Sequence, residues 1–188
     1  MHIRLANESD ASAIRAIYAP LVEETTISFE HAPPSEEEIA QRVRTTLATH
    51  PWLVAEIDGD IAGYAYAGTH RSRTAYQWAT EVSVYVNTHY RRRGVAKKLY
   101  TALLEALRFL GYVNAYAGIA QPNEASVALH EAFGFEPVGV YRRVGFKHDE
   151  WHDVGWWQLR LREDDAPEPP RRLVEVVESE EWEAVLAG

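Results

Sequence analysis

No cysteine occurs among the 188 residues of the chain. Its absence excludes disulfides, a catalytic thiolate and zinc or iron–sulfur centres held by cysteine. The sequence also lacks an apolar run of membrane-spanning length, and residues 1–8 lack the apolar core of a secretory signal. We therefore expect a cytoplasmic protein with no membrane partner.

Positive charge is scarce. The chain has 19 Lys and Arg residues against 28 Asp and Glu residues, which gives a formal net charge of -9. Broad nucleic-acid binding depends on many contacts between cations and phosphates, so we expect no nucleic-acid partner. A local basic cluster in such a chain suits one small anionic ligand.

The sequence favours one domain followed by an extension. A hydrophobic content of 46% is enough for one buried core, which we expect to span residues 1–162. Residues 163–188 form a separate segment. It begins as a charged, proline-containing linker and ends with enough apolar residues for a short strand or helix. We expect that last part to dock on the domain or on another subunit.

The spacing of apolar residues changes repeatedly between the period of strands and that of helices. It predicts a strand at 2–5, helices near 13–21 and 35–47, strands at 52–57, 61–67 and 78–86, a helix at 94–110, a strand at 112–118, a helix at 123–133 and strands at 135–146 and 154–161. The order β-α-α-β-β-β-α-β-α-β-β predicts a mixed α/β fold. Its twisted sheet is mostly antiparallel with helices on both faces, and the strands that flank helix 94–110 run parallel. Residues 22–34 form a loop that we expect to cover a site.

Five cations gather where the helix at 94–110 begins: Arg91, Arg92, Arg93, Lys97 and Lys98. A helix N-terminus is already partly positive, so each cation there costs ~0.3–1 kcal/mol. A bound phosphate would reverse this penalty, and Gly94 and Ala96 would let the backbone approach it closely. The alternative is a solvated charge run on a surface helix. The P-loop and the three-glycine dinucleotide fingerprint are both absent from the sequence.

Three motifs resemble those of a known family. Arg91-x-x-Gly94-x-Ala96 after a strand resembles the pyrophosphate motif of the GNAT superfamily of acetyl-CoA-dependent N-acetyltransferases, and residues 123–135 resemble its Asn-x(5)-Leu-Tyr-x(3)-Gly-Phe segment, with His130 at the tyrosine position. Residues 71–81, 129–131 and 145–155 are similar to the phosphinothricin and methionine sulfone/sulfoximine acetyltransferase branch. The likeness covers residues 1 to about 162.

The resemblance implies acetyl-CoA as cosubstrate and direct attack by an amine in a ternary complex. It also implies that N–H groups near residues 84–86 stabilise the oxyanion and that these residues pair with the pantetheine arm. The implied cofactor-binding residues are Val84, Tyr85, Val86, Arg91, Arg92, Arg93, Gly94, Val95, Ala96, Lys97 and Asn123.

Acyl transfer to an amine needs a group that removes a proton, because an ammonium has no lone pair. The resemblance implies Glu81 as general base, through water, with His130 facing the same cleft. Burial disfavours the charged form of a carboxylate and so can make it a useful base. The alternatives are a solvated strand-end glutamate and a packing histidine. Which of the two takes the amine proton stays open.

We expect four residues to bind the acceptor substrate. Arg71, Arg73 and Tyr76 offer two cations and a hydroxyl to a carboxylate or phosphinate, and Phe29 walls the pocket. The alternative for the first three is an ordinary surface hairpin end.

Two histidines four residues apart, His148 and His152, can share a metal ion when they lie on a helix. The pattern around them is strand, loop, strand, so we favour a loop near the substrate mouth or a dimer contact. We expect no metal.

The sequence therefore predicts an N-acetyltransferase that acts on the α-amine of a small amino-acid-like acceptor. We expect it to form a homodimer. The alternatives are an acetyltransferase for protein N-termini or another amine, and a CoA-binding module without turnover.

Overall fold

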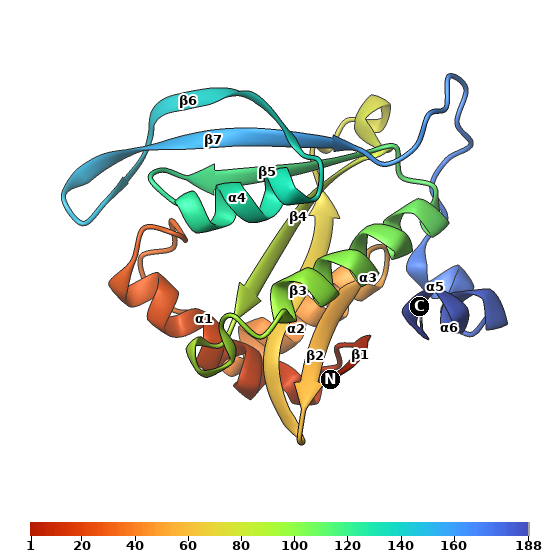
Figure 1. The fold of residues 1–188 in the computed structure, drawn as a ribbon, viewed down its shortest axis with the longest axis horizontal. Helices are drawn as coiled ribbons and strands as arrows, with labels where there is room; N and C mark the ends of the chain where they lie inside the picture. Colours follow the sequence, from red (N-terminus) through yellow and green to blue (C-terminus); the bar gives the residue numbers. More distant parts are fainter. Residues whose placement is uncertain (188) are drawn as a thin grey trace.

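The computed structural model describes residues 1–187, in which seven strands form a single sheet in the order β1-β2-β3-β4-β5-β7-β6 (Figure 1). The strands are β1 (His2–Leu5), β2 (Trp52–Ile57), β3 (Asp60–Thr69), β4 (Ala79–Val86), β5 (Asn114–Ala120), β6 (Glu136–Lys147) and β7 (Glu150–Arg160). Strands β4 and β5 run parallel, and the other neighbours run antiparallel.

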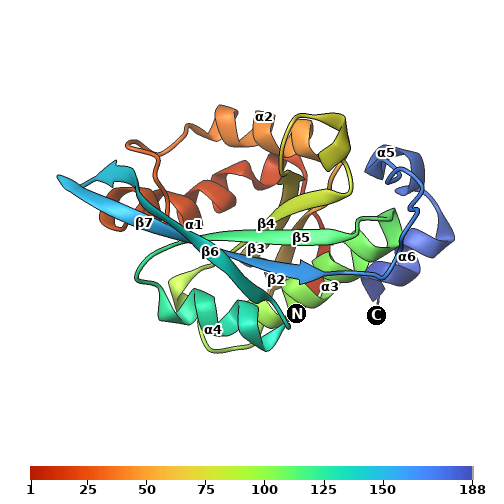
Figure 2. The same ribbon diagram turned by 90° about the horizontal axis from the view of Figure 1, so that it is seen from above.

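Helices cover both faces of the sheet (Figure 2). Helices α1 (Ala11–Glu24) and α2 (Glu36–Leu47) lie on one face, and α3 (Val95–Leu110) and α4 (Glu124–Ala132) lie on the other. The first pair packs on Trp52, Val54 and Tyr64, whereas α3 packs on a larger cluster that includes Leu53 and Ala65. Each face of the sheet therefore has its own apolar core.

Two glycines set the limits of α3. Gly94 and Gly111 adopt the left-handed conformation, with φ of 78° and 98°, which glycine accepts at low cost. Between them, the predicted apolar stripe is buried against the sheet. It consists of Val95, Leu99, Leu103, Leu107 and Leu110.

The predicted order of elements matches the structure, with one clear error near the end. The expected loop before residue 154 is wrong, because β6 continues to Lys147 and β7 already begins at Glu150. The turn is confined to His148 and Asp149, with φ of 50° and 61°. Both strands project beyond the body here and stay largely exposed, so the sequence lacks the alternation by which half-buried strands are found.

The C-terminal extension folds back on the domain. Helices α5 (Leu173–Val176) and α6 (Glu180–Ala187) lie beside α3 (Figure 1), with Leu173 and Trp182 buried. The Trp182 ring packs 6.1 Å from the ring of Phe109 in α3. The expected docking on the body is therefore seen, while the domain boundary at residue 162 stays a prediction.

No helix within residues 1–187 combines the length and apolarity needed to cross a membrane. In the same range, no group of three or more histidine or acidic side chains is arranged to hold a metal ion.

Candidate active site

The parallel strands β4 and β5 separate in the middle of the sheet. They pair from Ala79 with Asn114 to Glu81 with Tyr116, and the two strands then diverge (Figure 1). On its other edge β4 stays paired with β3 as far as Val86. Within the described residues, the edge of β4 beyond Glu81 therefore has no strand partner, and its backbone groups are available to a ligand.

A hollow occupies this gap between the strands. It is lined by β4 residues 82–85 and β5 residues 117–120, by Ile27 from the α1–α2 connection, and by Tyr100, Asn123, Ser126 and His130 from the side of α3 and α4. Successive residues of a strand point to opposite faces of its sheet. On β4, Val82 and Val84 pack with the α3 cluster, whereas Tyr85 lies edge-on to Tyr18 of α1. The hollow thus reaches both faces of the sheet.

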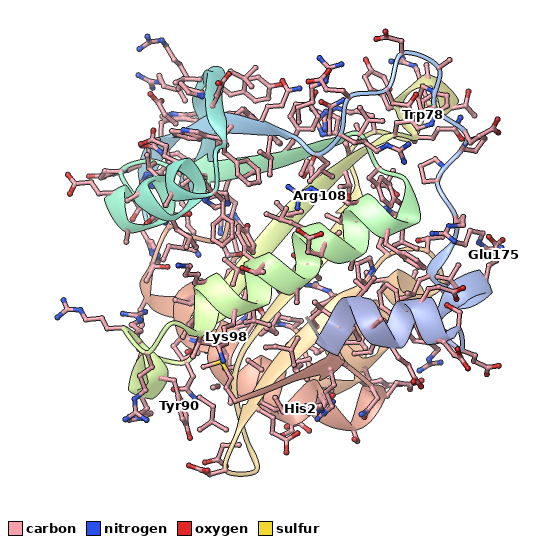
Figure 3. All side chains as sticks on the ribbon, turned by 45° about the vertical axis from the view of Figure 1, so that its right-hand side comes forward. His2, Trp78, Tyr90, Lys98, Arg108 and Glu175 are labelled. Carbon is pink, nitrogen blue, oxygen red and sulfur yellow. The ribbon has the colours of Figure 1, made fainter. Side chains whose placement is uncertain are left out.

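The basic turn lies just beyond the end of β4, at the start of α3. Arg91, Arg92, Arg93, Lys97 and Lys98 are all exposed. The Arg93 guanidinium lies 5.3 Å from the centre of the Tyr90 ring, and Figure 3 labels Tyr90 and Lys98 at this end of the molecule. No ion pair within residues 1–187 involves any of the five cations. Within the described residues, none of these five cations has a direct carboxylate partner.

The other residues of the predicted pyrophosphate motif lie at the start of α3, where Val95 is buried and Ala96 is half-buried. Space beside Gly94 is open, since a Cβ built there meets no atom within 4 Å. Asn123 caps α4, and its side-chain oxygen accepts a hydrogen bond from the Ser126 N–H at 3.2 Å. The motif residues therefore border an open surface at the α3 and α4 side of the sheet.

His130 is buried and held by two hydrogen bonds. Its Nδ1 lies 2.7 Å from the Ser126 carbonyl oxygen, and its Nε2 lies 2.8 Å from the Tyr100 hydroxyl. A carbonyl can only accept, so Nδ1 carries the proton and Nε2 accepts from Tyr100. Burial lowers the pKa of His130, and the bond to Ser126 offsets part of that effect. The imidazole is therefore neutral at pH 7, and the lone pair of Nε2 accepts the hydrogen bond from the Tyr100 hydroxyl.

Glu81 lies on the opposite side of β4 from this pair. Its carboxylate accepts hydrogen bonds from His70 at 2.9 Å and from Arg71 at 3.2 Å. The side chain is 38% exposed, so Glu81 lacks the burial by which a carboxylate can become a stronger base. Glu81 is instead a carboxylate that water can reach and that a neighbouring guanidinium orients.

The four predicted acceptor residues are spread over the same face. Arg71 reaches Glu81 and also lies over the Trp156 ring, 5.8 Å from its centre. Arg73 and Tyr76 are exposed and, with Arg71, line a neighbouring hollow beside residues 170–172 of the extension. Phe29 packs against the β6–β7 hairpin, and Ile27 is the loop residue that lines the hollow between β4 and β5.

Comparisons with known proteins identify the family. A family model described as an acetyltransferase (GNAT) domain matches residues 3–156. The chain belongs to this GNAT acetyltransferase family. A phosphinothricin N-acetyltransferase from Streptomyces viridochromogenes is 40% identical over 171 residues, which cover 91% of this chain and 92% of the relative. An L-methionine sulfoximine/L-methionine sulfone acetyltransferase from Salmonella typhimurium is 33% identical, over 89% of this chain and 99% of the relative.

A solved structure gives the same fold. The GNAT superfamily phosphinothricin acetyltransferase from Sinorhizobium meliloti, in complex with AcCoA, superimposes with a TM-score of 0.84 at 37% identity and covers 89% of this chain and 91% of that one. The predicted family and the predicted fold of this GNAT acetyltransferase are both confirmed.

Tyr100 is a functional candidate that the sequence analysis did not find. It follows Leu99 in the apolar stripe of α3 and is indistinguishable from a core residue there. One general rule could have pointed to Tyr100: a buried tyrosine hydroxyl usually has a hydrogen-bond partner, so a tyrosine in an apolar stripe predicts a polar side chain beside it. That partner is His130, thirty residues further along this GNAT acetyltransferase.

We predict that NMR titration of His130 gives a midpoint below the usual histidine value of about 6.5, because burial opposes the imidazolium. The nitrogen chemical shifts at pH 7 should report a protonated Nδ1 and an unprotonated Nε2. A His130→Gln variant assigns the signals. A midpoint above 6.5, or a proton on Nε2, would contradict the geometry.

Proposed function

We propose that this GNAT acetyltransferase transfers the acetyl group of acetyl-CoA to the α-amine of a small amino-acid-like acceptor. The observation that carries the proposal is the hollow between β4 and β5, which reaches both faces of the sheet. Two substrates can approach it from opposite sides and react inside it, which removes the entropic cost of their encounter from the chemical step. The names of the relatives support an acceptor that resembles phosphinothricin or methionine sulfone.

For the cosubstrate, the unpaired edge of β4 at Val84, Tyr85 and Val86 suits strand-like hydrogen bonds to the pantetheine arm. The five cations of the basic turn suit the pyrophosphate, which also gains from the N–H groups of a helix N-terminus. When bound, acetyl-CoA supplies the activated acetyl group. The proposed pyrophosphate contacts come from Arg91, Arg92, Arg93, Gly94, Val95, Ala96 and Lys97, and Asn123 contributes from α4.

Glu81 is the proposed group that makes the acceptor amine reactive. A water molecule beside its exposed carboxylate would pass the ammonium proton to it. Arg71 is hydrogen-bonded to the same carboxylate and fixes its direction. The base then acts from the α1 and α2 face of the sheet, where we propose that the acceptor enters.

Tyr100 and His130 are proposed to move the second proton. As the C–N bond forms, the nitrogen gives a proton to the Tyr100 oxygen while the Tyr100 hydroxyl proton passes to Nε2 of His130. The imidazolium keeps both of its hydrogen bonds, now donating to Tyr100 and to the Ser126 carbonyl. The reverse movement returns this proton to the departing thiolate. Glu81, which water can reach, releases the ammonium proton to solvent, so the protein ends the cycle unchanged.

Arg71, Arg73 and Tyr76 are proposed to recognise the acidic group of the acceptor, with Phe29 supporting the loop beside it. A guanidinium binds a carboxylate or phosphinate through two parallel hydrogen bonds. Within residues 1–187 no ion pair engages Arg73, so its guanidinium is available to the acceptor.

We also propose a cytoplasmic location, since a chain without cysteine has no need of an oxidising compartment.

The deciding experiment measures thiol release from acetyl-CoA with a panel of acceptors. The panel contains the common amino acids, phosphinothricin, methionine sulfone, methionine sulfoximine and peptides with free N-termini. Turnover with small amino-acid-like acceptors supports the proposal. Turnover with peptides alone assigns the protein to N-terminal acetylation, and binding of acetyl-CoA without any turnover indicates a non-catalytic module.

Glu81→Gln should lower kcat at least about 100-fold, because general base catalysis typically contributes 10²–10⁴-fold. Its Kd for acetyl-CoA should stay within twofold of the wild-type value, since the proposed cosubstrate contacts lie elsewhere. Glu178→Gln, at an exposed position of the C-terminal extension, is the control and should keep the wild-type kcat. Equal turnover in wild type and Glu81→Gln would remove Glu81 from the mechanism.

Gly94→Glu should abolish measurable acetyl-CoA binding in calorimetry, because it puts a negative charge beside the proposed pyrophosphate site. The space around Gly94 is open, so the effect comes from charge and from the positive φ of 78°. Gly94→Ala carries the same backbone strain without the charge and should bind more tightly than Gly94→Glu. Wild-type affinity in Gly94→Glu would exclude this turn as the phosphate site.

We further propose that the protein is a homodimer that pairs through β6, which is the edge strand of the sheet. Val138 and Val140 are 59% and 50% exposed, and a long apolar edge is usually covered by a partner. Val138→Glu with Val140→Glu should convert a dimer to a monomer in light scattering. Val174→Glu, also at an exposed valine, should leave the dimer intact. A monomeric wild-type protein would refute the proposal.

A further inference from the structure

Lys147, at the end of β6, is a buried cation that the mechanism above does not use. Only 3% of the residue is exposed. Its Nζ donates to the backbone carbonyls of Val22 at 2.6 Å, Thr25 at 2.9 Å and Ser28 at 2.7 Å. An ammonium group has three N–H donors, so all of them are satisfied by these carbonyls. Burying a charge is costly unless its hydrogen bonds are met in this way.

The three carbonyls belong to one stretch of chain. Val22 lies in the last turn of α1, Thr25 is the residue that ends that helix, and Ser28 lies in the α1–α2 loop, residues 25–35. The last carbonyls of a helix have no partner within it, and they form its negative end. Lys147 therefore caps α1 and fastens the beginning of the α1–α2 loop with the same group.

A second contact joins the hairpin to this loop. The Phe29 ring lies directly over Gly145, where any added Cβ would overlap it, and its centre is 6.2 Å from that of the His152 ring. Gly145 and Lys147 are buried, whereas Val144 and Phe146 between and beside them are exposed. One face of the hairpin tip is thus built to receive the loop.

The loop also has contacts to the helices. The Ser28 and Tyr18 hydroxyls are 2.7 Å apart, and Arg42 pairs with Glu30 at 2.7 Å. These bonds tie the loop to α1 and α2 and do not fix its distance from the sheet. Between two of the carbonyls bound by Lys147 lies Ile27, the loop residue that lines the hollow between β4 and β5.

We propose that Lys147 is a positioning residue that holds the α1–α2 loop to the sheet, so that Ile27 closes the acceptor side of the hollow. The inference rests on the proposed function for the identity of that side. Tyr100, Asn123 and His130 approach the hollow from the other face. The loop therefore controls the fit of the acceptor and leaves the cosubstrate contacts unchanged.

The test compares the kinetics of Lys147→Met and the wild type with the best acceptor of the panel. Met keeps an unbranched side chain and removes the charge. The KM for the acceptor should rise at least tenfold, while the KM for acetyl-CoA stays within twofold. Simple loss of folded protein would lower the apparent kcat and leave both KM values unchanged.

Two further variants keep the test valid if Lys147→Met folds poorly. Gly145→Ala pushes Phe29 away from the hairpin and should raise the acceptor KM alone. Val176→Ala removes buried contacts in α5, far along the chain from the loop, and should lower the melting temperature with both KM values unchanged. An unchanged acceptor KM in the folded Lys147→Met and Gly145→Ala variants, or an equal rise for both substrates, would overturn the inference.

Hydrogen exchange tests the attachment of the α1–α2 loop by Lys147, here called the tether, independently of the proposed function. Amides of residues 25–31 should exchange at least tenfold faster in Lys147→Met than in the wild type, while those of α2 keep their protection. Unchanged exchange in the loop would overturn the tether. If the wild type acetylates no acceptor, the proposed function fails and the acceptor role of the loop fails with it, although faster exchange would still establish the tether.

Discussion

The separation of β4 and β5 after Glu81 and Tyr116 is the constraint on which the rest of the structure depends. Backbone N–H and C=O groups inside a sheet are normally paired, so an unpaired edge at its centre needs water or a ligand. The gap also gives both faces of the sheet access to one small space. Side chains from the α1–α2 loop, α3 and α4 can act there together, although a continuous sheet would keep them apart.

The basic turn is a second constraint, and it is electrostatic. Five cations with no ion pair among the described residues lie at a helix N-terminus, where each costs ~0.3–1 kcal/mol. Their sum is a noticeable part of the ~5–15 kcal/mol by which domains are stable. A bound anion would offset this cost and so stabilise the folded protein. This cost, in a chain of net charge -9, is the reason for the proposal that the turn is a ligand site.

Features that depend on neighbours in sequence could be predicted. The stripe of α3 between Gly94 and Gly111 defines a helix, and the run at 58–60 defines a hairpin, because periodicity and turn chemistry act over a few residues. Features that depend on distant partners could not. The bond of Tyr100 spans 30 residues, and the bonds of Lys147 span 119 to 125. Neither residue differs locally from an ordinary core tyrosine or strand-end lysine.

His130 stands on α4 at the position where the superfamily motif that residues 123–135 resemble has tyrosine, and a histidine holds a proton there differently. Burial raises the pKa of Tyr100 above its usual range, so a tyrosinate beside the hollow is unfavourable. His130 can instead accept a proton at Nε2 and remain hydrogen-bonded at both nitrogens, to Tyr100 and to Ser126. In the proposed mechanism Tyr100 therefore conducts the proton and His130 stores it. Glu81, on the other face of β4, is left to deprotonate the ammonium of the incoming acceptor.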